Sequence, residues 1–389
     1  MDAYYSYANQ IREELHRIPE IGFDLPKTLA VVHRELDKMG LSYTDKWGRS
    51  SVVGYVGPQD APFTIGLRAD MDALPIREEV DLPYKSTHDG LMHACGHDSH
   101  TAILLTILKY FVEHADALRC RIKFLFTPAE EYTTPGCKEL AENGVMDDVD
   151  CCLATHCTPD RNIGTLLMTG DDLGSNSLGF KVRFYGLSAH AASQQKGKDA
   201  VLMAVEAITA MEFMAAKEIK VTDARLLNIG AIHGGKTNNV VCDFVEIFGS
   251  CRAHTDEVTD FMERRIQEIC QGVALTSGGK VEYERVKFLP YRVNNPKLYE
   301  KALEAAAHAL GEDKIIHPKT RGLGGEDFGY LTRLKPCFFS FFGCKPLDKE
   351  SVPPVHNSKF VLPNESMEAP IRYTIQFVLN NMDGIEGLS

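Results

Sequence analysis

Residues 93–100 hold the densest group of chemically active side chains in the sequence. They read HACGHDSH, so three imidazoles, one thiol and one carboxylate fall within eight residues. Cys95 and His97 are separated by one glycine, which relaxes the backbone constraint in a tight loop. Thiolate and neutral imidazole are standard ligands of transition metals. The segment therefore predicts two ligands of a metal site that residues from further along the chain complete.

Glu131, His156 and His356 are the best candidates for the remaining ligands. Glu131 and His156 follow apolar segments that we interpret as strands, and His356 lies in a loop before the last expected helix. Glu130 directly precedes Glu131, and the pair has two interpretations. It is either a solvated acidic pair on the surface, or one carboxylate binds metal while the other takes a proton from an activated water.

Strands and helices are expected to alternate in the first part of the chain. We expect helices at 11–16, 27–39 and 101–115, and strands at 51–56, 63–69, 121–126 and 151–155. This alternation predicts a mainly parallel sheet covered by helices. Asp72, Glu130, Glu131 and His156 each come just after an expected strand. Open α/β sheets place their sites at the carboxyl ends of the strands, so we expect these side chains to meet there.

The pattern changes near residue 178, where apolar and polar residues alternate as in half-exposed strands. The following segments have the order β-α-β-β-α-β, which is typical of a small ferredoxin-like domain. These elements are expected at 180–185, 199–217, 226–232, 241–250, 256–274 and 281–284. A chain of 389 residues favours two domains. We predict a main domain from residues 1–177 and 291–389, with an inserted domain at 178–290. A helix at 295–310, a strand at 337–342 and a helix at 366–382 would complete the main domain.

The composition excludes several classes of partner. A net charge of −12 argues against a nucleic-acid partner, and no stretch is apolar enough to span a membrane. The first residues have neither the basic start nor the apolar run of a signal peptide. Eleven cysteines are an odd number, which favours reduced thiols over a disulfide framework. These features predict a cytoplasmic protein.

Five motifs closely resemble the metal-dependent amidohydrolases. They are 16–23 (HRIPEIGF), 67–75 (LRADMDALP), 93–100 (HACGHDSH), 128–131 (PAEE) and 325–328 (GEDF). That family includes hippurate hydrolases, N-acyl-amino-acid amidohydrolases and plant hydrolases of auxin–amino-acid conjugates, and a wider group adds aminoacylases and dinuclear-zinc exopeptidases. The likeness runs in order from about residue 11 to 380. It implies a mainly parallel-sheet, metallo-exopeptidase-like α/β catalytic domain with an inserted ferredoxin-like α+β domain that acts as lid and dimerisation domain.

The resemblance also implies a site with two adjacent divalent metal ions. It assigns metal ligation to Cys95, His97, Glu131, His156 and His356. Glu130 becomes the general base acting on a metal-bound water. The thiolate and three imidazoles favour zinc, whereas manganese or cobalt is an alternative because relatives differ. Asp72, Asp98, His100 and His93 would orient these groups, although helix capping and loop hydrogen bonds explain the last three equally well.

In the inserted domain, the segment 188–192 (SAHAA) resembles the lid motif of the family. His190 would polarise the scissile carbonyl and stabilise the oxyanion, and Asn239 and Arg252 match substrate-binding positions of the lid. A guanidinium suits a substrate carboxylate because it binds both oxygens. Two departures put the lid contacts in question. Relatives commonly carry Pro-His where this chain has Gln194-Gln195, and a proline where it has Cys242.

The resemblance implies hydrolysis of a small N-acyl amino acid by a homodimer paired through the inserted domain, with His190 acting in its own subunit or in its partner. Three alternatives stay open. The same site could serve a dipeptidase or carboxypeptidase. The fold could belong to a non-catalytic metal-binding or regulatory protein, which would have no use for Glu130 as a base. Cys95 could instead be the nucleophile of a cysteine hydrolase.

Overall fold

The computed structural model describes residues 1–388 and divides the chain into two compact units. Unit 1 comprises Met1–Leu173, Arg292–Arg321 and the chain from Asp327 onward, and unit 2 comprises Gly174–Tyr291 and Gly322–Glu326. Unit 2 begins four residues before the predicted insertion because its first strand starts earlier. The short segment 322–326, far along the chain, also belongs to unit 2. That unit 2 acts as a lid or a dimerisation domain stays a prediction.

The sheet of unit 1 has eight strands and a parallel centre, as predicted. Its strand order is β1-β2-β4-β3-β5-β12-β6-β11, and β4, β3, β5 and β12 are mutually parallel neighbours. The strands are β1 (Tyr43–Thr44), β2 (Val52–Val56), β3 (Thr64–Asp70), β4 (Arg121–Thr127), β5 (Cys151–Asn162), β6 (Leu166–Leu167), β11 (Ile315–Ile316) and β12 (Cys337–Lys345). Both faces of the central strands are buried, and β3 and β4 carry the buried charged residues Arg68, Asp70 and Lys123 among their apolar ones.

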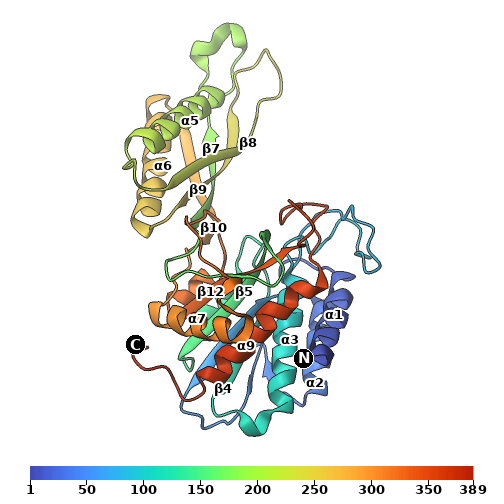
Figure 1. The fold of residues 1–389 in the computed structure, drawn as a ribbon. Coiled ribbons are helices and arrows are strands. Elements are labelled where there is room, and N and C mark those ends of the chain that lie inside the picture. The colour runs from blue at the N-terminus through green and yellow to red at the C-terminus, as the bar shows by residue number, and fades with distance from the viewer. Residues whose placement is uncertain (389) are drawn as a thin grey trace. The chain divides into compact units, whose positions relative to one another are not determined.

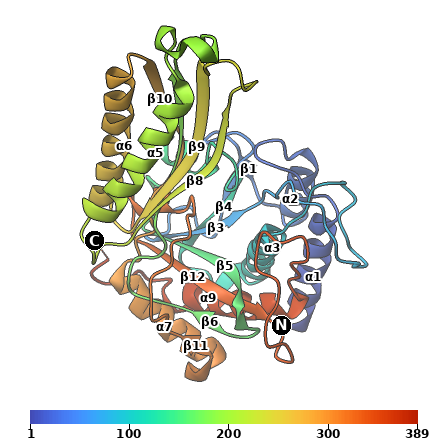
Figure 2. The same cartoon turned by 90° about the horizontal axis from the view of Figure 1, so that it is seen from above.

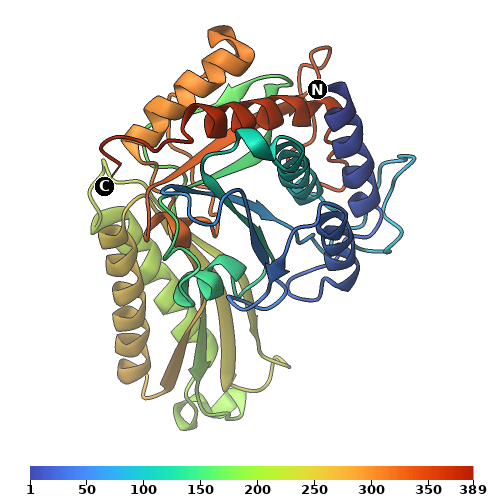
Figure 3. The ribbon, with the colours of Figure 1, turned by 90° about the horizontal axis from the view of Figure 1, so that it is seen from below.

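Helices cover both faces of this sheet. The largest core packs helices α1, α2, α3, α7 and α9 on one face, whereas a second core packs α4 and α8 on the other. Figure 1 shows α1, α3 and α9 as neighbours, and Figure 3 shows them from below in blue, teal and red. The helices are α1 (Asp2–His16), α2 (Pro26–Lys38), α3 (His97–Glu113), α4 (Gly136–Glu142), α7 (Pro296–Leu310), α8 (Gly329–Thr332) and α9 (Glu368–Asn380), with 3₁₀ turns η1 (Ala115–Ala117), η3 (Glu312–Lys314) and η4 (Asn364–Met367).

Unit 2 has the predicted β-α-β-β-α-β order. Its elements are β7 (Asn176–Tyr185), η2 (Ala191–Lys196), α5 (Ala200–Lys217), β8 (Arg225–Gly234), β9 (Phe244–Ala253), α6 (Asp256–Thr276) and β10 (Lys280–Leu289). The strands form one antiparallel sheet in the order β10-β7-β9-β8. Figure 2 shows α5 and α6 side by side on one face of this sheet, where their apolar residues pack into a separate core.

Two details at the predicted site differ from the expectation. β5 continues to Asn162, so His156 lies within the strand and not after it, because β5 stays paired with β12 beyond that point. Helix α3 begins at His97, four residues before the predicted start, so half of the polar cluster lies in its first turn. Gly96 is the N-cap residue of α3 and has a φ of 79°, the left-handed conformation that glycine adopts without strain.

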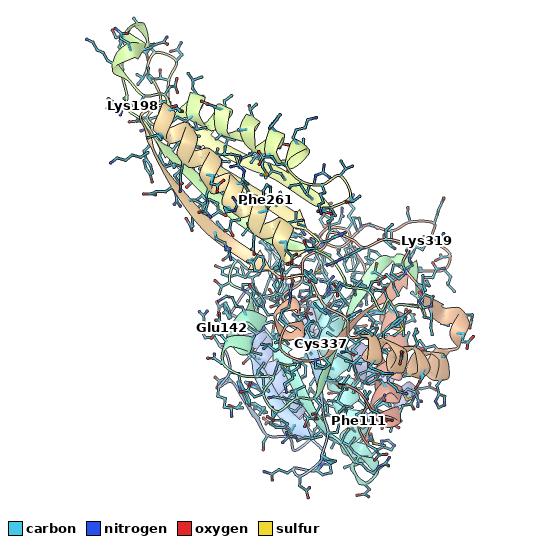
Figure 4. All side chains as sticks on the ribbon, turned by 90° about the vertical axis from the view of Figure 1, so that its left-hand side faces the viewer. Phe111, Glu142, Lys198, Phe261, Lys319 and Cys337 are labelled. Carbon is cyan, nitrogen blue, oxygen red and sulfur yellow. The ribbon has the colours of Figure 1, made fainter. Side chains whose placement is uncertain are left out.

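Two further findings concern the lengths of the helices and the cysteines. None of the helices between residues 1 and 388 is both long enough and apolar enough to cross a membrane. All eleven cysteines are free thiols, and ten of them are buried. Cys337, at the start of β12, is one of the buried ones and is labelled in Figure 4. The cytoplasmic location stays a prediction.

Candidate functional site

Cys95 lies at the centre of the candidate site. Its Sγ is 3.4 Å from His156 Nε2 and 3.3 Å from His356 Nε2. His356 Nε2 also lies 2.9 Å from Glu131 Oε1. Two groups of three share the thiol, Cys95–His97–His156 and Cys95–Glu131–His356, and within each group the possible ligand atoms are all within 4.8 Å of one another. The structure thus brings together the five predicted metal ligands from four distant parts of the sequence.

The backbone is strained at two points of this cluster. Only Ser50, Ala129 and His356 have a positive φ among the non-glycine residues that the structure describes, and the last two belong to the site. Ala129 directly precedes the Glu130–Glu131 pair, and His356 is itself a candidate ligand. A non-glycine residue in this conformation costs about 1–3 kcal/mol and persists only where the surroundings enforce it. The His356 N–H donates to the Ala94 carbonyl at 2.8 Å, which holds its loop against the Cys95 turn.

Asp72 joins the two halves of the cluster. Its Oδ1 accepts a hydrogen bond from the Glu130 N–H at 3.0 Å, and its Oδ2 accepts from the Glu131 N–H at 3.1 Å. Its Oδ1 also lies 3.4 Å from His97 Nδ1, a charge contact and not an aligned hydrogen bond. Burial is the main cause that raises the pKa of Asp72, against the opposing effect of His97. Asp72 therefore fixes the backbone of both glutamates relative to His97.

The donor set of the cluster fits a cation. His156 Nδ1 lies 2.7 Å from the Cys157 carbonyl, so this nitrogen carries the proton and Nε2 presents its lone pair toward Cys95. His97 is 1% exposed, yet neither of its ring nitrogens makes a hydrogen bond. A buried imidazole without a hydrogen-bond partner is costly unless another group satisfies it. A metal ion would satisfy it, and both histidines are suitably placed ligands.

The charges of Glu131 and Cys95 lead to the same conclusion. Burial alone would raise the pKa of Glu131, but the imidazoles of His356 and His97 lower it to about 2, so Glu131 is a carboxylate at neutral pH. Burial and the Glu131 charge raise the pKa of the Cys95 thiol well above its ordinary value. Cysteine nucleophiles need a low pKa, so these surroundings argue against Cys95 as a nucleophile. A bound cation would reverse the shift and make the thiolate available as a ligand.

His100 lies beside the cluster but is not available as a ligand, because both ring nitrogens are engaged. Nδ1 lies 2.6 Å from Asp70 Oδ1, and Nε2 accepts a hydrogen bond from the Cys157 N–H at 3.1 Å. Burial alone would raise the pKa of Asp70, but Arg68 and the neighbouring imidazoles hold this pKa well below its usual range. Arg68 also bonds Asp327, whose second oxygen accepts from the Cys137 N–H.

Sequence reasoning gave no role to Arg68, Asp70 or Asp327. A usable signal was present, because Arg68 and Asp70 are the charged residues of a mostly apolar strand, and all seven of its residues are buried. Buried charges are almost always paired, so two of them in one buried strand predict a network of partners. Through Asp70, this network holds His100 in place and sets a carboxylate near His97.

Asp98 points into a different buried network. One of its oxygens lies 3.1 Å from Arg12 Nε and 2.8 Å from His16 Nδ1, and both partners come from α1. The other ring nitrogen of His16, Nε2, lies 3.3 Å from Glu78 Oε1. His93 is buried beside this network, and burial lowers its pKa to about 3, so it is neutral. Asp98 and His93 thus flank the Cys95 turn, and Asp98 belongs to a network that faces α1 while His93 lies beside it.

In unit 2, His190 and Asn239 lie side by side. The Ala191 N–H donates to the Asn239 carbonyl at 3.0 Å, and His190 forms a β-bridge with the residue after Asn239. Both side chains are exposed. His190 Nδ1 accepts a hydrogen bond from the Ala192 N–H at 3.0 Å, so the proton of a neutral ring is on Nε2.

The two departures from the family pattern lie near His190. Gln194 and Gln195 are exposed in the 3₁₀ turn η2 that His190 caps. The Cys242 thiol donates to the Phe244 carbonyl at 3.1 Å, so it is engaged within its own loop. The glutamines therefore offer amide groups to solvent next to His190, where relatives commonly carry Pro-His.

Arg252 lies at the opposite end of the same sheet. It pairs with Ser177 near the start of β7, whereas Phe244, beside the His190 segment, pairs with Tyr185 at the end of β7. Phe244 and Arg252 are eight positions apart along β9, which is about 27 Å at the rise of an antiparallel strand. Figure 4 labels Lys198, which pairs with Leu187, at one tip of unit 2, and this tip carries the His190 segment. The structure does not bring Arg252 and Asn239 together.

Comparisons with known proteins identify the family of the chain. A model of peptidase family M20/M25/M40 matches residues 66–380. IAA-amino acid hydrolase ILR1-like 4 of Arabidopsis thaliana is 31% identical over 93% of this chain and 82% of its own length. The hippurate hydrolase of Campylobacter jejuni is 29% identical over 95% of both chains. The solved YXEP protein of Bacillus subtilis, described as a dinuclear metal binding peptidase from the M20 family, has a TM-score of 0.81 and 26% identity, with 98% of this chain and 99% of that chain covered.

The family model extends over most of the chain, and it spans β3 to α9 with the candidate ligands and Glu130 inside it. Membership in the peptidase family agrees with the resemblance seen in the five sequence motifs. The chain belongs to peptidase family M20/M25/M40 and is a hydrolase of linear amides.

Proposed function

We propose that this protein is a metal-dependent amidohydrolase that cleaves small N-acyl amino acids into an acyl group and a free amino acid. One observation carries the proposal: two groups of candidate ligands share Cys95, and Asp72 holds Glu130 next to them. Cys95, His97, Glu131, His156 and His356 would hold two divalent ions. The thiolate and imidazole donors favour zinc, with manganese or cobalt as alternatives.

The bound ions would supply Lewis-acid polarisation of the carbonyl and activation of a water molecule. Glu130 would act as the general base. It is 7% exposed, and its backbone is fixed by Asp72, so its carboxylate is held in a dry site with little freedom. It would take the proton from the attacking water and later deliver it to the leaving amine. Such a positioned proton-transfer group contributes about 100-fold to 10,000-fold in rate.

His190 would stabilise the oxyanion that forms on the carbonyl oxygen. With Nδ1 engaged by the Ala192 N–H, a neutral His190 has its N–H at Nε2, and this donor is exposed to an incoming substrate. Asn239 adds an amide group beside it. A donor aimed at developing negative charge is worth more in the transition state than in the ground state.

The distance between Arg252 and His190 supports action across a dimer. Arg252 would bind the substrate carboxylate, yet it lies about 27 Å from the His190 end of the sheet. A small N-acyl amino acid cannot span this distance. If both residues contact one substrate molecule, they must come from different subunits. We therefore favour a homodimer in which His190 acts in trans.

The surface of unit 2 offers an interface for this dimer. β8 is an edge strand, so its outer side has no neighbouring strand within the sheet. On α5, Leu202 is 65% exposed and Phe213 is 61% exposed, and Val201 and Val205 are exposed on the same helix. Exposed apolar residues gathered on one helix often mark an interaction site. Together with the edge of β8, they support pairing through unit 2.

Peptide hydrolysis is the second candidate function, because YXEP is described as a peptidase. The test is a panel of N-acetyl and N-benzoyl amino acids assayed beside dipeptides, with the metal content of the purified protein measured. Our proposal predicts that the N-acyl amino acids have the higher kcat/KM. Faster cleavage of the dipeptides would favour the peptidase, and metal binding without hydrolysis of either class would favour a non-catalytic role.

A further inference from the structure

A row of aromatic rings on one face of the central sheet ends beside the candidate metal ligands. Phe328 and Phe339 have ring centroids 5.7 Å apart, and Phe339 and Phe341 have centroids 5.3 Å apart at 74°. The next ring is His156, whose centroid is 6.0 Å from that of Phe341. All four residues belong to unit 1, and each pair is in the range in which aromatic rings attract one another.

The position of Phe341 follows from the strand register. Phe339 and Phe341 are two residues apart in β12, so both side chains lie on the same face of the sheet. Phe341 pairs with His156 on the neighbouring parallel strand β5. Residues in register on adjacent strands point to the same face, so the benzyl group and the imidazole stand next to each other. Phe341 thus lies one strand away from a candidate metal ligand.

Burial separates Phe341 from the rest of the row. Phe328 is 0% exposed and Phe339 is 1% exposed, so these two rings are part of the core. Phe341 is only partly buried, although it is the ring nearest to the candidate ligands. A large apolar ring that remains accessible beside a site of charged and polar groups is placed to contact a ligand. The inner rings are enclosed by the core, whereas Phe341 packs against the core on one side and keeps part of its ring accessible.

We propose that Phe341 contacts the substrate and determines its specificity by favouring a planar apolar group next to the scissile carbonyl. The inference rests on the proposed function, because it takes the carbonyl to lie at the ligands around His156. The groups attached to a carbonyl bound beside His156 would lie within reach of the Phe341 ring. An aromatic acyl group or an aromatic amino-acid side chain would stack on Phe341, whereas an acetyl group or glycine would leave the ring without this contact.

The test compares substrates that differ only in the planar group. The metal-loaded protein is assayed on N-acetylglycine, N-benzoylglycine and N-acetylphenylalanine, and kcat and KM are measured separately. The variant is Phe341→Leu, which keeps an apolar side chain but removes the ring. Phe339→Leu is the matched control, because it removes a buried ring of the same row. Phe341→Tyr keeps the ring and is the conservative variant.

For Phe341→Leu, we expect the preference for N-benzoylglycine or N-acetylphenylalanine over N-acetylglycine to fall about five- to tenfold, mainly through KM. A loss confined to the benzoyl substrate places the ring beside the acyl group, and a loss confined to the phenylalanine substrate places it beside the side chain. Phe341→Tyr should keep the preference, and Phe339→Leu should keep it even if the protein is less stable. An unchanged preference in Phe341→Leu, or an equal change in Phe339→Leu, would overturn the inference.

A binding measurement separates this inference from the proposed function. Calorimetry of benzoate and acetate with the metal-loaded protein does not need turnover. Tighter binding of benzoate that Phe341→Leu removes would support the aromatic contact even if no N-acyl amino acid were hydrolysed, a result that contradicts the proposed function alone. Equal binding of both anions, with normal hydrolysis of N-acyl amino acids, would contradict the contact at Phe341 alone.

Discussion

The cluster around Cys95 in unit 1 and the His190 segment in unit 2 hold their side chains in different ways. In unit 1, the groups next to the candidate ligands are buried and engaged in fixed contacts: Asp72 bonds two backbone N–H groups, and His100 bonds on both sides of its ring. In unit 2, His190 and Asn239 are exposed, and the described chain gives them only local hydrogen bonds.

The difference indicates two kinds of site. A buried cluster whose neighbouring groups are held by fixed contacts is organised before any substrate arrives, so its geometry does not depend on the substrate. Exposed side chains such as those of His190 and Asn239 gain their contacts only when a substrate or a second subunit reaches them. We therefore expect changes in unit 1 to affect metal binding and stability, and changes in unit 2 to affect catalysis without loss of metal.

Metal removal should have the largest effect. Chelation should reduce hydrolysis to background, because ions held by the two ligand groups that share Cys95 would activate the water and polarise the carbonyl. Zinc, manganese or cobalt added back should restore activity. The measurement is the rate on an N-acyl amino acid together with the metal content. Full activity in protein shown to be metal-free would contradict the account of unit 1.

Asp98→Asn should strongly destabilise unit 1, although the two side chains have nearly the same shape. Asp98 and Arg12 are both 1% exposed, and removing one partner of a buried pair costs about 3–5 kcal/mol. Urea unfolding measures this difference. The exposed Glu268→Gln in unit 2 is the control and should cause no measurable change.

The stability that the Asp98–Arg12 pair contributes should depend on pH. Burial alone would raise the pKa of Asp98, but Arg12 and His16 hold it well below the usual value. The pair therefore stabilises the fold above the ordinary carboxyl pKa of about 3.9, and this stability is lost as the pH falls toward the depressed value. The difference between wild type and Asp98→Asn should shrink in acid, as Asp98 becomes protonated. A difference that grows in acid would contradict the assignment.

His190→Ala should lower kcat by about 100-fold and leave the metal content unchanged, because one oxyanion donor is lost. Mixing this variant with Glu130→Gln tests action in trans. Subunit exchange would create one site with both groups intact, so activity should return. Exchange shown by mass spectrometry without recovered activity would place His190 in the site of its own subunit.

Arg252→Ala should raise KM about tenfold or more for substrates with a free carboxylate, and much less for their amides. The structure also gives Arg252 another contact, since its Nη1 donates to the Leu323 carbonyl at 2.7 Å, a carbonyl that Ser175 Oγ also bonds at 2.9 Å. Ser175→Ala is therefore the matched control. If it reproduces the effect of Arg252→Ala, the arginine acts by holding residues 322–326 and not by binding substrate.

The sequence was sufficient to predict the parallel sheet, the family and the five residues that come together around Cys95. These features depend on local patterns and on motifs with fixed spacing. The end of β5 could not be predicted in the same way. His156 lies inside the strand because β12, almost two hundred residues later, continues to pair with it, and no local pattern carries that information.

The positions within unit 2 show a second limit. Arg252 and Asn239 are thirteen residues apart, and the family pattern groups them as substrate contacts, yet the strand β9 between them carries them to opposite ends of the sheet. Separation along a strand grows by about 3.4 Å per residue, so closeness in sequence does not mean closeness in space. The Arg68–Asp70–Asp327 network was missed for the opposite reason, because Asp327 is remote in sequence and adjacent in space.

We propose that Glu131 holds metal while Glu130 moves the proton. The most direct test measures metal content and kcat in Glu130→Gln and Glu131→Gln, two isosteric changes at adjacent residues. We predict that Glu130→Gln keeps the metal content of the wild type and loses about 100-fold or more in kcat, whereas Glu131→Gln loses metal. Normal metal content and near-normal rates in both variants would contradict the claim.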